Sequence, residues 1–190
     1  MRAFLGTVAI DAAAADDRPP VATSAWSPFE STRHGYSVKV PSERSAHPGT
    51  APWPFPPGVD YPPNAVDEFL PVPPDPGNFT AISQAIPGGA TEDQWLTEYD
   101  QDLFHNGCFD PPSTWEAIDV AGHAGRAHGG MTQCNFTEAV VIVGGRAYVF
   151  TVSPNKTALS GLVYDRALFN ALLSTVVFAP ETADDTPAGG

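Results

Sequence analysis

The chain has 190 residues, enough for one domain that buries its own core, with shorter segments at its ends. It carries 22 acidic and nine basic side chains, a net charge of −13, which excludes most nucleic-acid binders because few cations could neutralise phosphates. This charge favours solubility and leaves a basic partner or cationic ligand open. No stretch is long and apolar enough for a transmembrane helix, and we expect a monomer.

Residues 1–28 are expected to precede the folded domain. Residues 1–15 combine one basic residue, a short apolar run and small residues at the end, as a signal peptide does. Asp11 interrupts the run, so a mis-assigned start or the remnant of a longer chain fits the segment equally well. Residues 11–28 are rich in Ala, Asp and Pro and predict a disordered lead-in.

The first expected strand is 34–40 (HGYSVKV), which alternates apolar and polar residues and ends at Pro41. From 48 to 76 the chain holds 11 prolines among 29 residues, so this proline-rich flap cannot be helical. Within it, 65–72 predicts an edge strand because of Pro71.

The aromatic residues of the proline-rich flap have two interpretations. They form either a binding surface for a ligand or partner, or an extended cover whose rings pack onto the domain. The candidate surface residues are Trp53, Phe55 and Tyr61.

A strand at 79–86 precedes the best-specified helix of the chain. Thr91 followed three residues later by Gln94 matches a capping box, and Asn106-Gly107 supplies a stop. The apolar stripe of this helix repeats every four residues, at Trp95, Tyr99 and Leu103. Its carboxylates are expected on a solvated face: Glu92, Asp93, Glu98, Asp100 and Asp102.

The strongest structural signal is 138–152, two apolar runs joined by Gly144-Gly145. A Gly-Gly link supplies the positive φ of type I′ and II′ turns, so the segment predicts a hairpin. That turn places Val143 opposite Arg146 and makes both faces of the ribbon apolar. Such a hairpin belongs at the centre of a sheet covered on both sides.

Further strands are expected at 114–120 and 125–130, and a helix capped by Asp165 carries an apolar stripe from Leu168 to Leu173. Residues 176–178 fit either a short strand or a helix end. The fold class is therefore α+β, an antiparallel sheet flanked by helices. The domain spans 29–179, and the acidic tail 180–190 is expected to be disordered.

Several of these segments together resemble a poorly characterised bacterial extracytoplasmic family with a PsbP/LpqN-like fold. The matching segments are HGYSVKVP at 34–41, the helix opening 91–96, Asn106-Gly107-Cys108, 119–123 and the hairpin. The resemblance implies an antiparallel sheet flanked by helices in a sandwich, and an exported protein. Pro41-Ser42-Glu43-Arg44 departs from the Gly-Trp pair of the family, and no lipobox cysteine is present.

The two cysteines, Cys108 and Cys134, allow one pairing, and export favours a disulfide that contributes roughly 3 to 4 kcal/mol. A zinc site is the competing interpretation, because the ligand types are present although their spacing matches no common motif. Its candidate ligands are His105, Cys108, His123, His128 and Cys134.

The sequence contains no nucleophile elbow, metalloprotease motif or phosphate-binding loop. We therefore assign no catalytic residue, cofactor or metal. The leading hypothesis is a non-catalytic extracytoplasmic binding or accessory module for an unknown protein or small molecule. The alternatives are a small hydrolase-type enzyme with an acidic and histidine site, and a purely structural domain of an envelope protein.

Overall fold

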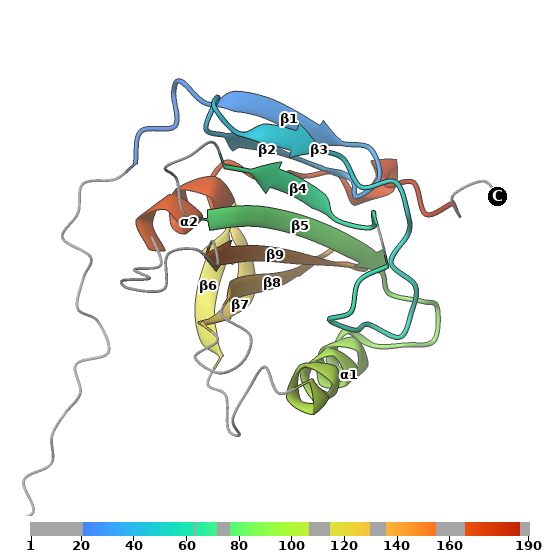
Figure 1. The fold of residues 1–190 in the computed structure, drawn as a ribbon. Coiled ribbons are helices and arrows are strands. Elements are labelled where there is room, and N and C mark those ends of the chain that lie inside the picture. Colours follow the sequence, from blue (N-terminus) through green and yellow to red (C-terminus); the bar gives the residue numbers. More distant parts are fainter. Residues whose placement is uncertain are drawn as a thin grey trace, which may run out of the picture.

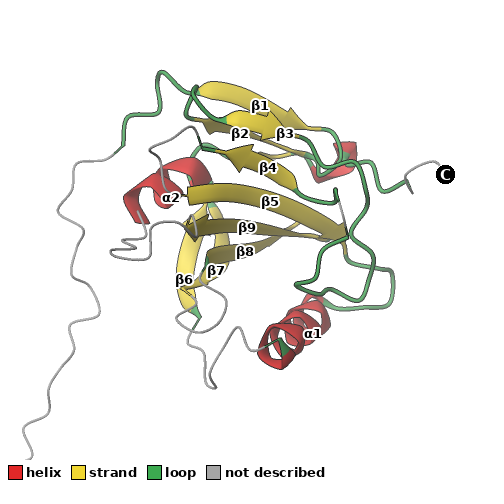
Figure 2. Ribbon diagram, in the orientation of Figure 1, coloured by secondary structure: helices red, strands yellow, loops and turns green. Residues whose placement is uncertain are grey.

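The structure is a computed structural model that describes residues 21–62, 64–71, 77–106, 115–129, 136–154 and 166–186. Ten strands, two α-helices and a 3-10 helix make up this part of the chain (Figures 1 and 2). The strands are β1 (Ser27–Ser31), β2 (Tyr36–Val40), β3 (Ser45–His47), β4 (Asp67–Leu70), β5 (Gly77–Ala85), β6 (Glu116–Val120), β7 (His123–Gly129), β8 (Thr137–Val143), β9 (Arg146–Pro154) and β10 (Val177–Phe178). The helices are α1 (Glu92–His105), α2 (Arg166–Leu173) and the 3-10 helix η1 (Pro180–Thr182).

Seven strands form one antiparallel sheet in the order β3-β4-β5-β9-β8-β7-β6. The predicted hairpin lies near its middle as β8 and β9, and Val143 pairs with Arg146 as expected. Gly144 and Gly145 have φ angles of 59° and 74°, which only glycine adopts at low cost. This confirms the hairpin, its register and its central position.

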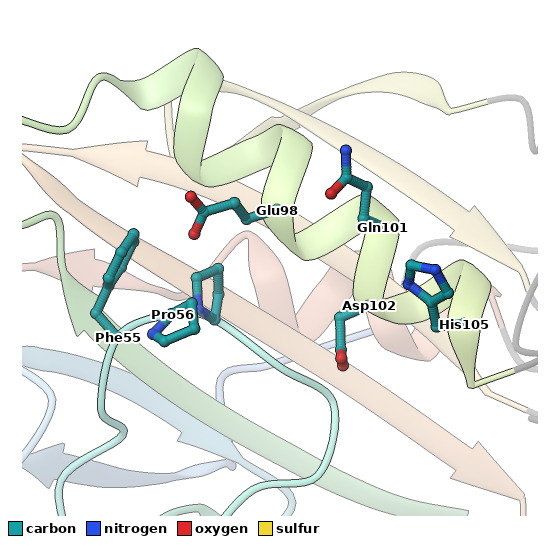
Figure 3. Close-up of a pocket in the computed structure, with 7 residues that line it drawn as sticks. Phe55, Pro56, Glu98, Gln101, Asp102 and His105 are labelled. Atoms are coloured by element: carbon teal, nitrogen blue, oxygen red, sulfur yellow. The ribbon is translucent and has the colours of Figure 1, made fainter.

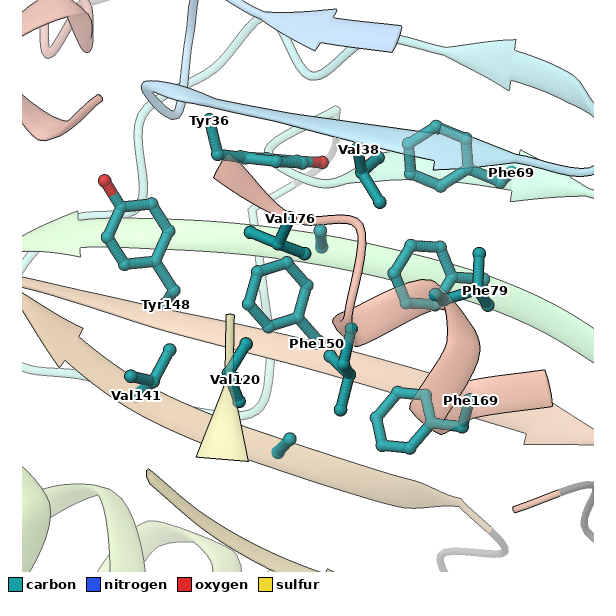
Figure 4. Close-up of a cluster of buried hydrophobic side chains, with 14 of the residues drawn as sticks. Tyr36, Val38, Phe69, Phe79, Val120, Val141, Tyr148, Phe150, Phe169 and Val176 are labelled. Carbon is teal, nitrogen blue, oxygen red and sulfur yellow. The ribbon is translucent and has the colours of Figure 1, made fainter. Parts of the chain in front are cut away.

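The two faces of the hairpin are buried in different hydrophobic clusters. Ala139, Val141, Tyr148 and Phe150 point into one cluster, which β2 and α2 complete (Figure 4). Val140, Ala147 and Val149 point into the other, which α1 and the flap complete. Alternate residues of a strand face opposite sides, so an apolar run across β8 and β9 requires cover on both.

The first cluster is covered by a second sheet as well as by a helix. Strands β1, β2 and β10 form a small antiparallel sheet that lies with α2 on this side of the large sheet (Figure 1). The sequence predicted β2 and α2 and left 176–178 open between a short strand and a helix end; the structure has the strand β10 there. The sequence did not predict β1, which starts at Ser27, inside the expected lead-in.

Helix α1 covers the opposite face, and its N-terminus is fixed as the sequence predicted. The Thr91 hydroxyl accepts a hydrogen bond from the Gln94 backbone N–H at 3.1 Å, and the Gln94 side chain accepts one from the Thr91 N–H at 2.8 Å. Its stripe of Trp95, Tyr99 and Leu103 is fully buried. The capping box therefore starts a helix whose apolar side seats on the sheet.

The strand predicted at 65–72 is β4, but it is not an edge strand. Its outer neighbour is β3, which pairs Ser45 with Leu70 and His47 with Glu68. All three residues of β3 are exposed and none belongs to an apolar alternation. The sequence around β3 has no apolar alternation that predicts a strand. Its strand conformation comes from pairing with β4.

The described architecture confirms the α+β class. Among the described residues, no helix has the length and apolarity needed to cross a membrane.

The C-terminal segment differs from the expectation of a disordered tail from Pro180. Residues 180–186 are part of the described structure and contact the turn between β1 and β2. The Ala179 N–H donates to the Gly35 carbonyl at 2.8 Å, and the Asp184 N–H donates to the Thr32 carbonyl at 3.0 Å. Composition suggested disorder here because the partners that hold the segment, Thr32 and Gly35 among them, are distant in the chain.

Gly35 stands at this contact, and we expect Gly35→Ala to lower the free energy of unfolding by about 2 to 4 kcal/mol. Its φ is +66°, and a Cβ would lie 2.6 Å from the Ala179 carbonyl oxygen. Gly88→Ala is the matched control, because a Cβ there meets nothing within 4 Å. Denaturant unfolding measures both, and equal losses would show that the close approach to Ala179 does not matter.

Candidate functional site

The proline-rich flap is anchored by Trp53, which is buried between the sheet and α1. Its ring makes edge contacts with Tyr61, Trp95 and Tyr99, with centroids 5.3 to 6.0 Å apart. The backbone carbonyl of Trp53 accepts a hydrogen bond from the Gln84 side-chain nitrogen Nε2 at 3.0 Å. The Trp95 indole N–H donates to the Gln84 side-chain oxygen Oε1 at 2.6 Å. Aromatic edge contacts of this kind stabilise packing beyond the area that they bury.

The candidate surface of Trp53, Phe55 and Tyr61 is therefore divided. Trp53 is buried and Tyr61 is half-buried, with its hydroxyl 3.4 Å from that of Tyr99. Only Phe55 is exposed, at 40%. For Trp53 and Tyr61 the geometry agrees with packing onto the domain, whereas Phe55 remains a candidate for contact with a partner.

Phe55 borders a hollow of about 470 Å³ between the flap and α1. The flap contributes Phe55 and two prolines, and α1 contributes polar side chains from one face (Figure 3). The lining residues are Phe55, Pro56, Pro57, Glu98, Gln101, Asp102 and His105. The helix residues recur at spacings of three and four, which places them on one side of α1.

The two carboxylates of the hollow are in different states. Asp102 is held within the fold, since it accepts hydrogen bonds from the Val59 N–H at 2.7 Å and the Asn106 side chain at 3.1 Å. In Glu98, the oxygen Oε2 is buried and accepts no hydrogen bond from the described residues. Figure 3 shows its carboxylate extending from α1 towards Phe55 and Pro56. A buried carboxylate oxygen without a donor is costly, so this position favours a ligand that can donate.

These two carboxylates were expected on a solvated helix face. The structure instead covers this face with the flap, and the spacing of Glu98, Asp102 and His105 is the signal that could have identified it. The spacing shows which residues share a side of α1 but not which segment lies over that side.

A second polar group lies between α1 and the sheet. Glu138 is buried, and its two carboxylate oxygens face His128 Nε2 at 2.7 Å and the Tyr99 hydroxyl at 2.9 Å. Burial raises the pKa of Tyr99 and of Tyr61 well above the usual value of 10, and the negative charge of Glu138 adds to both shifts. Both phenols therefore stay protonated at physiological pH. None of these side chains lines the hollow.

His34 and Ser83 form a third polar group, which resembles a catalytic histidine–serine pair but has a different hydrogen-bond pattern. The Ser83 backbone N–H donates to His34 Nδ1 at 3.1 Å, and His34 Nε2 lies 2.8 Å from the Ala65 carbonyl. The imidazole is therefore neutral, with its proton on Nε2. The Ser83 hydroxyl also lies 3.2 Å from Nδ1, but Nδ1 already accepts the Ser83 N–H, and the hydroxyl donates to the His34 carbonyl at 3.1 Å. This geometry does not direct the serine proton to the imidazole, as activation of a nucleophile would require.

The remaining candidates are separated or lie outside the described residues. Among the described residues, no three histidine, cysteine or acidic side chains are placed to hold a metal ion. His123 packs against Phe178 and His128 pairs with Glu138. Cys108 and Cys134 lie outside the described residues, so the disulfide stays a prediction.

No protein-family model matches the chain, and no curated protein matches its sequence. Among solved structures, the chain is similar to the solution structure of PsbP (CyanoP) from Synechocystis sp. PCC 6803. The TM-score is 0.49 at 13% identity, covering 83% of this chain and 95% of that one. A crystal structure from Bacteroides thetaiotaomicron VPI-5482 has a TM-score of 0.48 at 13% identity, covering 83% of this chain and half of that one. A PsbP is thus among the similar structures, and the likeness concerns the fold.

We expect the buried His34 to make stability fall as the pH drops below about 6.5. Burial lowers its pKa from the usual 6.5, an effect that Asp67 opposes and that Arg146 and Arg33 reinforce. Below pH 6.5 the unfolded chain therefore binds a proton that the folded chain does not, so the free energy of unfolding decreases as the pH falls towards the lowered pKa of the folded state. The loss should stop once the pH passes the lowered pKa of the folded state.

Urea unfolding at pH 7.5 and 5.5 measures this effect. His34→Gln should reduce the difference between the two pH values, whereas His47→Gln, at an exposed position in β3, should leave it at the wild-type value. If the pH difference persists in the His34 variant, another group causes it.

Proposed function

We propose that this protein is a non-catalytic extracytoplasmic binding module that holds an arginine or lysine side chain of a protein partner in the hollow between the flap and α1. The observation that carries the proposal is the buried Glu98 oxygen, which accepts no hydrogen bond from the described residues while its carboxylate faces the flap. A guanidinium or ammonium group supplies both the missing donor and the opposite charge.

The flap side of the hollow suits the rest of such a side chain. Phe55, Pro56 and Pro57 offer an aromatic and aliphatic wall beside the carboxylate. Arginine and lysine pack their methylene stems on apolar surface while the charged head group reaches a polar partner. The exposed ring of Phe55 can also face the cation, a contact of about 0.5 to 1 kcal/mol at an accessible site.

The size of the hollow supports a side chain rather than a large ligand. Its volume of about 470 Å³ lies in the lower half of the range of small-molecule sites, which run from about 300 to 1,000 Å³. One wall is the exposed Phe55, so the hollow is accessible from solution. The net charge of −13 would also steer a basic partner towards the domain.

The extracytoplasmic location rests on the sequence. The signal-like residues 1–15 and the family resemblance support it, and a Cys108–Cys134 disulfide is the pairing that export predicts. Mass measurement of natively produced protein with and without reductant tests it, since free thiols would argue against export.

The hydrolase alternative would need an acidic and histidine pair that reaches substrate. His128 and Glu138 form a hydrogen-bonded pair of this type, but both side chains are at least nine-tenths buried. His105 lines the hollow with Glu98 and Asp102, but among the described residues it forms no hydrogen bond with either carboxylate. Glu138 already accepts hydrogen bonds at both oxygens. A binding role is therefore better supported than hydrolysis.

The test is an NMR titration with two short peptides, acetyl-Ala-Arg-Ala-amide and the same peptide with neutral citrulline in place of arginine. The arginine peptide should shift the amide resonances of α1 around Glu98, and the citrulline peptide should bind at least tenfold more weakly. Glu98→Gln should lower the affinity about tenfold, because one charge-assisted hydrogen bond contributes about 1.4 kcal/mol or more.

Two further variants define the surface. Phe55→Ala should weaken binding about threefold, while Glu92→Gln, an exposed acidic position on α1 outside the hollow, should bind like the wild type. Equal affinity for both peptides, or an unchanged affinity in the Glu98 variant, would contradict the proposal. Trp53→Ala is not a test of capture, because Trp53 is buried and its loss would destabilise the flap.

A further inference from the structure

Two arginines converge on the C-terminal segment. Arg146, at the start of β9, forms an ion pair with Asp185 although its own side chain is only 5% exposed. Arg33, in the turn between β1 and β2, donates to the carbonyls of Asp184 and Thr186, the latter at 2.8 Å. The chain has nine basic residues in all, so two at one short acidic segment are a notable concentration.

Both guanidinium groups are oriented by the domain itself. Arg146 donates from one nitrogen to the Ser83 hydroxyl at 2.9 Å, and that hydroxyl donates in turn to the His34 carbonyl at 3.1 Å. Arg33 donates to the Thr50 carbonyl at 2.8 Å. Contacts outside the C-terminal segment therefore position the remaining N–H groups of both arginines, as in a preformed anion site.

The C-terminal segment contacts this site as an extended peptide with its outer side in water. The side chains of Asp184 and Asp185 are 51% and 55% exposed, while their arginine partners are 13% and 5% exposed. The Thr186 hydroxyl and N–H donate to the Asp184 carboxylate at 2.6 and 2.9 Å and lower its pKa, with a smaller contribution from Arg33. The two aspartate side chains are therefore accessible from solution, whereas their arginine partners are held within the fold.

A buried guanidinium without an anion would be costly, because removing a charged group from water without a partner is unfavourable. The site therefore requires a carboxylate, but nothing in its geometry requires that the carboxylate belong to the same chain. From this we propose that Arg33 and Arg146 form a binding site for acidic peptides with adjacent aspartates, and that residues 184–186 occupy it as a tethered ligand which such a peptide of another protein replaces.

Because residues 184–186 are covalently linked to the domain, they compete with a free peptide for Arg33 and Arg146. A segment linked to its own site competes at an effective concentration of about a millimolar. A free peptide therefore binds the wild-type chain weakly and gains access when the acidic side chains of the segment are neutralised. This property distinguishes a tethered ligand from a segment that only completes the fold.

The test uses the full chain carrying Asp184→Asn and Asp185→Asn together, and a fluorescein-labelled peptide of the sequence PETADDTPA as the probe. Fluorescence anisotropy should show that this double variant binds the peptide at least tenfold more tightly than the wild type. The same peptide with both aspartates replaced by asparagine should not bind. Adding Arg33→Gln to the double variant should reduce its affinity at least fivefold, and higher salt should weaken binding.

Glu181→Gln is the matched control, because Glu181 lies in the same segment and forms no ion pair with either arginine in the described structure. This variant should behave like the wild type. Equal binding of the aspartate and asparagine peptides, or no binding to a folded double variant, would overturn the proposal and leave the segment a purely structural clip.

A second measurement needs no substitution and so does not depend on how the variants fold. Titrating the unlabelled aspartate peptide to millimolar concentration onto the isotope-labelled wild-type full chain should shift the backbone amide resonances of Asp184 and Asp185, because the displaced segment enters solvent. The asparagine peptide should leave them in place. Identical spectra with the two peptides would also overturn the proposal.

Discussion

The fold depends on a hairpin that is apolar on both faces. Strands β8 and β9 place Tyr148 and Phe150 on one side and Val149 on the other, all essentially without exposure. Each buried side chain of this size contributes roughly 1.5 to 3 kcal/mol, so neither face can remain in water. The small sheet with α2 covers one side, and α1 with the proline-rich flap covers the other.

The features that the sequence predicted correctly are those specified by residues close together in the chain. The Gly144-Gly145 turn and the Thr91 capping box depend on residues within a few positions, and both were predicted correctly. Strand β3 and the contacts of residues 180–186 depend on partners that are distant in the chain. Composition alone suggested a disordered tail, because it cannot show that Arg33 and Arg146 meet there.

The candidate site also depends on tertiary contacts that local sequence signals do not specify. Proline content predicted that the flap is extended. The sequence does not distinguish Trp53 from Phe55, because both are aromatic residues between prolines. Only the position of α1 decides that Trp53 packs against Trp95 while Phe55 remains exposed. The polar face of α1 could be inferred from helical spacing, but its cover by the flap is a tertiary contact that the spacing does not specify.

The distribution of charge connects the two proposed sites. At least four of the nine cationic side chains bind groups of the chain itself, namely Arg33, Arg44, Arg126 and Arg146. Arg44 bonds two carbonyls across β4 and β5, and Arg126 pairs with Asp100 over the ring of Trp115. No lysine or arginine is among the residues that line the Glu98 hollow. At the C-terminal segment, the exposed side chains of Asp184 and Asp185 lie against the largely buried Arg33 and Arg146. Under the two proposals, basic groups of a partner would bind at the Glu98 hollow, and acidic groups would bind at Arg33 and Arg146, where residues 184–186 lie.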